Sequence, residues 1–460
     1  MASRITKTQR ESVLRMLAEG LDRYTIATSA GLTPGQVSAI AAHVKMGTYS
    51  LPSVPEATES ESILEQTEKS KNMLRELHKP GTSSAAEKRV TSVLLGFDVG
   101  NNDEVFWNPD PDSGSVNPHV LVLGESGFGK TYTIACLLAE LARQKIISVV
   151  FDYGQGFSVG SLPQEFVDTT HPVEIQASRD GIDINPLQIF PSDVLGPINV
   201  AQRIADTFAR VYPRIGVQQH AILRDAVLDV MSDAEIRTDN ARSWQRELPN
   251  FGDIHRKLLA YANNPLHPQS RLAASVASHI STLFVFNTFR PTGIKFNWRE
   301  IISGDSPVLV IQLKGLEYSL ERAVTELLLW NLIGYIEALG PSPIRCFIVL
   351  DEAHKLSFAQ GSPVEKLLRE GRKFGLGLIL ASQQPEDFSA VAFGNTATKI
   401  IFQVGDEKST ISRQLYRKIS NAPSFVDIYQ VITKLPRGCA YVVSENLGHV
   451  VRIASFSERA

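Results

Sequence analysis

Five short apolar runs, rich in Val, Ile and Leu, recur between residues 119 and 384, and each ends in turn-forming or polar residues. The stretches between them have the apolar spacing of helices. Runs that are apolar at nearly every position are typical of parallel strands covered on both faces. The pattern therefore predicts an α/β fold built on a largely parallel sheet, with strands in residues 119–124, 146–154, 307–315, 345–351 and 375–384.

Helical patterns without strand runs fill residues 191–300 and predict an all-helical insertion in this sheet. Residues 438–456 predict a closing β-hairpin, and the turn residues at 100–102 predict a second, short one. The predicted organisation is a helix-turn-helix-like domain (1–48), a linker with one solvated helix (49–90), a short β-hairpin region (91–117), the first part of the α/β core (118–190), the helical insertion (191–300), and the second part of the core with the C-terminal hairpin (301–460).

The N-terminal segment has Ala27, Gly31 and Val37 at the offsets of a helix-turn-helix. Thr33 and Gln36 form a Thr-x-x-Gln capping box, so the second helix is expected to start at about residue 34. In a recognition helix, Gln36, Ser38 and His43 would be exposed. A small helical domain that docks on a protein explains the same pattern, and both interpretations stay open.

The bulk composition is that of a soluble globular protein. The 460 residues are 43% hydrophobic and 21% charged, and the net charge of -3 argues against a uniformly basic nucleic-acid binder, although a local basic patch is compatible with it. The three cysteines are far apart in apolar runs, which predicts buried thiols in a reducing compartment. The most apolar helix, residues 326–339, is too short to span a bilayer. We therefore expect a cytoplasmic protein without a membrane segment.

The sequence GESGFGKT follows the first apolar run and opens a helical pattern, as a phosphate-binding loop does. Its glycines let backbone amides face phosphates at a helix N-terminus. Lys130 is expected to reach the terminal phosphates of ATP, and the Thr131 hydroxyl to bind Mg²⁺. The residues predicted to contact the nucleotide are Gly124, Glu125, Ser126, Gly127, Phe128, Gly129, Lys130, Thr131 and Tyr132.

A second pair of acidic residues follows the strand at 345–351. Asp351 stands at the strand end, where it can hold the magnesium shell, and Glu352 is the natural base for the attacking water. A strand end followed by a helix cap would also favour Asp. The phosphate loop upstream makes the catalytic interpretation the preferred one.

Polar residues at two further strand ends are candidates for the same site. In phosphate-loop ATPases with an extra strand between the two motifs, the strand after Asp-Glu ends in a polar sensor, and Gln383 is the candidate here. Its amide can accept a hydrogen bond from water and donate one to phosphate. Asp152 either assists with water or magnesium or caps the next turn, and both alternatives stay open.

Arg369, Arg372 and Lys373 stand at the end of a helix just before the Gln383 strand. They stabilise the helix C-terminus, or one of them reaches a neighbouring subunit's γ-phosphate as an arginine finger. The finger hypothesis names Arg372 first and Arg369 second.

Together, these segments resemble the HerA/FtsK superfamily of ring ATPases, nearest to the HerA branch, over roughly residues 92–457. The resemblance implies a RecA-like core, a homo-hexamer with ATP and Mg²⁺ between subunits, and double-stranded DNA in a central channel. It also implies an effector partner, such as a nuclease or an NAD-consuming enzyme, in DNA processing or anti-phage defence. The segments that carry it are NPHVLVLGESGFGKT, FDYGQGF, NVAQRIADTFARVY, FIVLDEAHKL and LLREGRKFGLGLILASQQPED.

Two departures from that family affect the functional hypotheses. The usual N-terminal β-barrel is replaced by the helix-turn-helix-like segment, and Gln403 stands where the family often has an arginine. The first hypothesis is an ATP-driven DNA translocase, and the second is a nucleotide-gated ring that holds and activates an effector. A pump ATPase of a conjugation or secretion system is the third, and the absence of a membrane segment argues against it.

Overall fold

The computed structural model describes residues 6–18, 23–46, 49, 92–110, 116–304, 306–384, 387–405, 424–444 and 447–459. The chain separates into two compact units, Met1–Lys88 and Arg89–Ala460. The segment 49–90, predicted as a linker with one helix, lies outside the described residues except for Tyr49.

The N-terminal unit contains three described helices, α1 (Lys7–Ala18), α2 (Arg23–Ala30) and α3 (Pro34–Lys45), around a small apolar core. The predicted capping box is confirmed: Thr33 and Gln36 bond each other's backbone amides, and α3 begins at Pro34. Gln36 is therefore half-buried instead of exposed. The His43 ring packs 5.2 Å from the Tyr49 ring. Ser38 and His43 are exposed, as expected, and a DNA-reading role for α3 stays a prediction.

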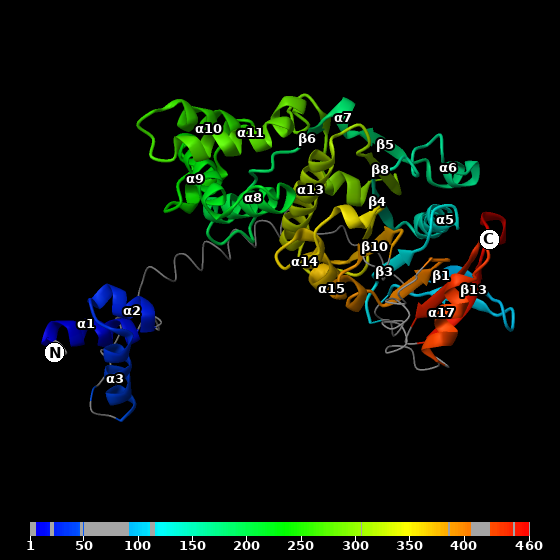
Figure 1. The fold of residues 1–460 in the computed structure, drawn as a ribbon, viewed down its shortest axis with the longest axis horizontal. Helices are drawn as coiled ribbons and strands as arrows, with labels where there is room; N and C mark the ends of the chain where they lie inside the picture. The colour runs from blue at the N-terminus through cyan, green and yellow to red at the C-terminus, as the bar shows by residue number, and fades with distance from the viewer. Residues whose placement is uncertain are drawn as a thin grey trace, which may run out of the picture. The chain divides into compact units, whose positions relative to one another are not determined.

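The second unit is built on one sheet in which eleven strands of the described residues take part (Figure 1). From β11 to β5 neighbouring strands are parallel, whereas β12, β13, β1 and β2 extend the sheet antiparallel. The predicted largely parallel sheet is confirmed. In spatial order the strands are β2 (Glu104–Trp107), β1 (Val93–Asp98), β13 (Leu447–Ile453), β12 (Cys439–Ser444), β11 (Thr398–Ile401), β3 (Val120–Leu123), β10 (Leu376–Ser382), β9 (Cys346–Leu350), β4 (Ile147–Asp152), β8 (Val308–Gln312) and β5 (Val173–Gln176).

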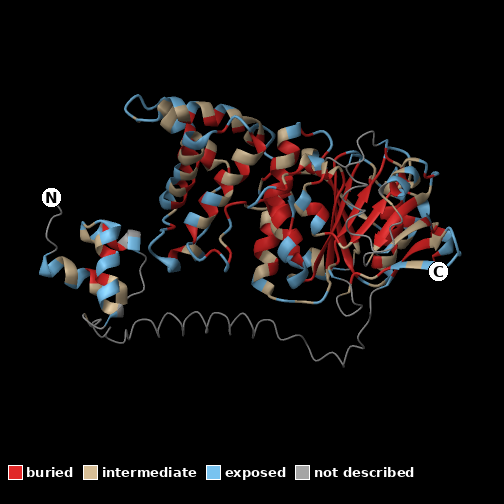
Figure 2. Ribbon diagram, turned by 60° about the horizontal axis from the view of Figure 1, so that its bottom comes forward, coloured by how far each residue is buried: buried red, intermediate tan, exposed pale blue. Residues whose placement is uncertain are grey.

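Alternate residues of the central strands enter two different hydrophobic cores. Along β9, Ile348 and Leu350 belong to the core that includes the insertion helices, and Phe347 and Val349 belong to the core under α5 (Lys130–Arg143). Successive side chains of a strand point to opposite faces, so the sheet is covered on both sides. Figure 2 shows these strands as a continuous buried layer between helices.

Helices α8–α11 fill the range of the predicted insertion, and α8 and α11 pack on α13 (Figure 1). A short parallel pair, β6 (Ile182–Asp183) and β7 (Ile294–Lys295), flanks their two ends in the chain. Among the described residues, no helix combines the length and the apolarity needed to cross a membrane. The other helical elements are α6 (Gln164–Thr170), α7 (Ala177–Asp180), α8 (Pro197–Val211), α9 (Val217–Asp233), η2 (Ala241–Gln245), α10 (Asp253–Asn263), α11 (Ser270–Phe286), α12 (Trp298–Ser303), α13 (Tyr318–Leu339), η3 (Ala353–Lys355), α14 (Pro363–Glu370), η4 (Gly371–Phe374), α15 (Ala390–Gly394), α17 (Phe425–Thr433) and η6 (Phe456–Glu458).

Candidate nucleotide-binding site

The predicted phosphate loop connects the end of β3 to the start of α5. Gly124, Gly127 and Gly129 have φ values of +151°, +84° and +116°. L-residues rarely adopt this region of the backbone map. A Cβ on Gly124 would also lie 2.5 Å from the Cβ of Phe402. Glycine is therefore required for the loop to curl at the N-terminus of α5.

Lys130 closes the loop from inside. Its Nζ donates to the carbonyl oxygen of Gly124 at 2.6 Å and to that of Glu125 at 3.1 Å. Burial lowers the pKa of Lys130, and the carboxylates of Glu352 and Asp351 oppose this shift. The cation is thus held at the loop, facing the acidic residues of the neighbouring strands.

The strand order brings the predicted site residues to one edge of the sheet. Strand β10 lies between β3 and β9, with Ser382 opposite Leu123 and Leu380 opposite Leu350. Strand β4 follows on the other side of β9. The carboxyl ends of parallel strands meet at the same edge. The phosphate loop, Gln383, Asp351 and Asp152 therefore all lie along the carboxyl edge of the sheet.

Thr131 and Asp351 converge on one glycine. A Cβ built on Gly156 would stand 3.6 Å from Thr131 Oγ1 and 3.8 Å from Asp351 Oδ2. Burial, followed by the negative charges of Asp152 and Glu352, raises the pKa of Asp351 to about 7. The Thr131 hydroxyl and the Asp351 carboxylate are oxygen ligands in a negatively charged environment. They form a suitable partial ligand set for a divalent cation.

Glu352 is held in place through both carboxylate oxygens. Gln383 Nε2 donates to Glu352 Oε1 at 3.0 Å, and His354 Nδ1 lies 3.2 Å from Oε2. His354 Nδ1 is also 3.3 Å from the hydroxyl of Ser382, at the end of β10. Glu352 has a φ of +54°, a conformation that is strained for a residue other than glycine. The end of β10 and the turn after β9 thus hold this side chain together.

Asp152 makes a different set of contacts. Oδ1 accepts from the backbone amides of Gly154 and Gln155 at 2.9 Å, and Oδ2 accepts from Phe157 N at 2.8 Å and from Gln312 Nε2 at 2.7 Å. The side chain is fully buried. These four donors to Asp152 support the capping alternative. The negative charge of Asp152 acts on Asp351 only through space. A direct catalytic role for Asp152 stays a prediction.

The arginines predicted as finger candidates lie at the opposite, amino edge of the sheet. Arg369 forms an ion pair with Glu365 one turn earlier in α14, and Arg372 donates to the carbonyl oxygen of Val116, just before β3. Lys373 stacks over Phe374. Strand β10 separates Arg372 from the carboxyl edge by about 20 Å of extended chain. These cations are therefore not brought to the phosphate loop of their own chain.

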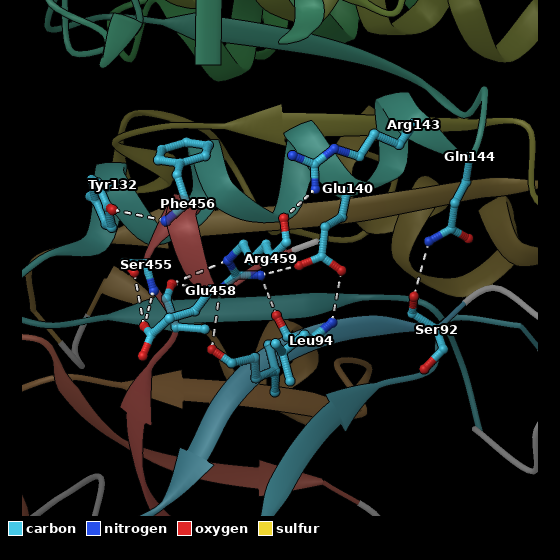
Figure 3. Close-up of polar contacts among 12 residues, drawn as sticks. Ser92, Leu94, Tyr132, Glu140, Arg143, Gln144, Ser455, Phe456, Glu458 and Arg459 are labelled. Atoms are coloured by element: carbon cyan, nitrogen blue, oxygen red, sulfur yellow. Dashed lines mark hydrogen bonds and ion pairs between the residues drawn. The ribbon is translucent and has the colours of Figure 1, made fainter. Parts of the chain in front are cut away.

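Two of the remaining residues predicted to contact the nucleotide, Glu125 and Tyr132, are held by the C-terminal part of the chain. The Glu125 amide donates to the Gln403 carbonyl at 2.9 Å, while Ser126 is exposed. Tyr132 packs edge-to-face on Phe456 and accepts from its amide at 3.2 Å (Figure 3). Part of Tyr132 faces solvent, with 39% of its surface exposed. Contact of these residues with a nucleotide stays a prediction.

Two residues near the site were missed from the sequence. His354 was not among the predicted site residues, although its Nδ1 lies 3.2 Å from Glu352 Oε2. Arg437 has a guanidinium nitrogen 3.3 Å from where a Cβ on Gly127 would stand. The Asp-Glu-Ala-His spacing was a usable signal for His354. No local signal identified Arg437, because it reaches the loop through strand pairing far along the chain.

A family model described as "Helicase HerA, central domain" matches residues 112–332, which include the phosphate loop and the helical insertion. Over these residues the chain is similar to HerA helicases. A "DNA double-strand break repair helicase HerA" from Sulfurisphaera tokodaii is 23% identical over 374 residues, covering 79% of this chain and 68% of that protein. The predicted resemblance to the HerA branch is confirmed.

Solved structures share the fold of this HerA-like chain. VirB4 of Thermoanaerobacter pseudethanolicus matches with a TM-score of 0.62 and 19% identity, covering 79% of this chain and 96% of that one. The plasmid coupling protein TrwB in complex with ADP and Mg²⁺ matches with a TM-score of 0.52 and 14% identity, covering 82% of this chain and 98% of that one. The predicted RecA-like architecture is therefore confirmed.

Proposed function

We propose that this HerA-like protein binds ATP with Mg²⁺ at the carboxyl edge of its sheet and uses hydrolysis to move along double-stranded DNA as a homo-hexameric ring. The observation that carries the proposal is the convergence of Lys130, Thr131, Asp351, Glu352 and Gln383 on adjacent strand ends. A family relative is described as a repair helicase, and a structural relative was solved with ADP and Mg²⁺.

The residues present fit a nucleotide-bound magnesium ion. The oxygens of Thr131 and Asp351 border the space beside Gly156, where a Cβ would stand 3.6 Å from Thr131 Oγ1 and 3.8 Å from Asp351 Oδ2. Mg²⁺ typically takes few protein ligands and completes its shell with phosphate oxygens and water. When bound, the ion neutralises charge on the phosphates. A positive charge here would also favour the ionised form of Asp351, which the surrounding carboxylates oppose.

Glu352 would take the proton of the attacking water. Its contact with the Gln383 amide places the base beside a group that can both donate and accept hydrogen bonds. Strand β10 lies next to the phosphate-loop strand, so Gln383 can bridge the water and the terminal phosphate. His354 would act as a positioning residue, since it contacts Glu352 and not the phosphate loop.

The separation of the carboxyl and amino edges of the sheet supports a ring. If Arg372 or Arg369 serves as an arginine finger, the geometry requires it to act on another subunit, because its own phosphate loop lies across the sheet. A hexamer is the assembly implied by the family resemblance. In such a ring, DNA would pass through the centre, and an effector such as a nuclease or an NAD-consuming enzyme would use the motor in DNA processing or anti-phage defence.

The deciding experiment is ATP hydrolysis by the purified chain during titration with duplex DNA, at low and at moderate salt. The translocase predicts strong stimulation that weakens as salt rises, because phosphate contacts release counterions. Turnover that DNA does not change would contradict DNA-coupled hydrolysis. It would favour a ring scaffold that holds and activates an effector, and the next step would be to identify that effector.

A further inference from the structure

The turn before β12 is fixed against the phosphate loop. Cys439 N donates to Pro436 O at 3.1 Å, and Gly438 has a φ of +76°, so the turn closes tightly around residue 437. Strand β12 pairs with β11, and β11 pairs with β3, the strand that leads into the loop. This pairing brings the turn beside the loop although more than 300 residues separate them.

One backbone contact joins the turn and the loop directly. Gly438 N donates to Phe128 O at 3.4 Å, and the Arg437 guanidinium comes over the adjacent Gly127, as its distance to the Cβ position there shows. Loop amides such as that of Gly127 are the groups that cradle phosphates in this motif. The guanidinium therefore stands beside the groups that would hold the nucleotide's anionic part.

Arg437 differs from the other arginines of the C-terminal segment. Arg452 pairs with Glu458, and Arg459 is buried against Glu140 and the Leu94 carbonyl (Figure 3). Within the part of the chain that the structure describes, no hydrogen-bond or ion-pair partner is found for Arg437, which is exposed. Such an arginine usually just contacts water. Arg437 differs because the turn before β12 holds it beside a predicted phosphate site.

The side from which Arg437 approaches indicates which phosphates it would contact. Gln383 and Glu352 come from β10 and β9, on one side of β3, whereas Arg437 comes from β12, on the other side. The phosphate attacked by water must face Gln383 and Glu352. A guanidinium from the opposite side is placed for the phosphates that remain in the product.

We infer that Arg437 is a phosphate-binding residue supplied by the same chain, and that it grips the diphosphate shared by ATP and ADP. This inference rests on the proposed ATP-binding function. A guanidinium can donate two parallel hydrogen bonds to phosphate oxygens, and such charged bonds are among the strong ones in proteins. Arg437 thereby tightens binding of substrate and product equally and leaves the chemical step unchanged.

The test measures the Kd of the full chain for ADP and for a non-hydrolysable ATP analogue, with Mg²⁺, by calorimetry. Arg437→Ala is expected to weaken the affinity for ADP and for the ATP analogue by about tenfold or more. This is the effect expected from losing one charge-assisted hydrogen bond. Arg437→Lys, which keeps the charge without the planar fork, should fall between. Lys434→Ala is the control, because it removes an exposed positive charge three residues before Arg437. It should change neither Kd by more than twofold.

The outcomes separate this inference from the function on which it rests. Wild-type protein that binds neither nucleotide overturns the proposed function itself. Nucleotide binding that Lys130→Ala abolishes but Arg437→Ala leaves unchanged overturns only the role of Arg437. A loss confined to the ATP analogue also overturns the inference, since the guanidinium would then contact the terminal phosphate. Without nucleotide, Arg437→Ala should have the same unfolding temperature as the wild type, which checks that its fold is intact.

Discussion

The carboxyl and amino edges of the parallel sheet differ in which candidate nucleotide-site groups they bring together. At the carboxyl edge, Lys130, Glu352 and Gln383 face one another, and the last two are hydrogen-bonded. At the amino edge, Arg369 pairs with Glu365 of its own helix, and Arg372 contacts a backbone carbonyl. The first edge gathers the groups that we propose bind and attack a phosphate. The second offers cations without a phosphate site, so we expect it to complete the site of a neighbouring copy.

The largest effect is expected from Arg372→Ala. Loss of an arginine finger lowers turnover on the order of 10³-fold. Mixing Arg372→Ala subunits with Lys130→Ala subunits should restore part of the activity, because some interfaces then pair an intact phosphate loop with an intact finger. ATPase assays on mixed rings, measured against each parent alone, give the readout. The same mixture with Arg369→Ala decides which arginine acts.

A mixture no more active than its two parents would contradict the arginine-finger hypothesis. Arg372 would then be only a cation that stabilises the amino edge, in keeping with its bond to the Val116 carbonyl. In that case Arg372→Ala should lower the unfolding temperature without lowering turnover per folded subunit.

The next largest effect is expected at the other edge. Glu352→Gln keeps the size and the hydrogen-bonding contact with Gln383 but cannot take a proton. We expect nucleotide affinity near the wild-type value and turnover lower by about 10² to 10³-fold, the usual contribution of a general base. Binding and single-turnover hydrolysis measured on the same preparation test this. Normal hydrolysis by Glu352→Gln would remove Glu352 from the catalytic role.

The sequence carried enough information for the sheet and the main motifs. The apolar runs around β3, β4, β8, β9 and β10 are local patterns, and they end where the structure places the site. Strand order is not local: that β10 lies between β3 and β9 was implied by the family resemblance and not by periodicity. Arg437 stayed hidden because only antiparallel pairing of β12 with β11 carries it to the loop.

Asp152 shows a second limit of the sequence. A carboxylate at a strand end is equally compatible with chemistry and with capping, and its neighbours in the sequence are the same in both cases. The positions of the Gly154, Gln155 and Phe157 amides, all three bonded to Asp152, favour capping. Such a distinction depends on backbone geometry that no residue pattern encodes.

A smaller effect is expected from pH at the amino edge. Burial, with the Arg372 charge as a further contribution, lowers the pKa of His119 from 6.5 to about 4, and its Nδ1 accepts from the Leu378 amide at 3.0 Å. The unfolded chain binds the proton more readily, so the contribution of His119 is complete above pH 6.5 and is lost as pH falls toward 4. At pH 5 the loss is about 2 kcal/mol, since one pKa unit corresponds to about 1.4 kcal/mol.

Urea unfolding of wild type and His119→Gln at pH 7.5 and pH 5 measures this loss. The glutamine can still accept from the Leu378 amide but does not titrate, so the variant should lose less stability on acidification. Equal losses in both proteins would show that other groups control the acid sensitivity of the amino edge.

The smallest effect is expected from His354, which touches Glu352 without touching the phosphate loop. His354→Ala should lower kcat by about tenfold, within the range for a misplaced catalytic group, and leave KM and nucleotide affinity unchanged. His354→Asn should recover most of the activity, because its amide nitrogen can stand where Nδ1 stands, 3.2 Å from Glu352 Oε2. An unchanged kcat in His354→Ala, or a change in KM alone, would mean that the Gln383 contact suffices to place the base. The position of Glu352 would then depend on its contact with Gln383, the residue that follows β10.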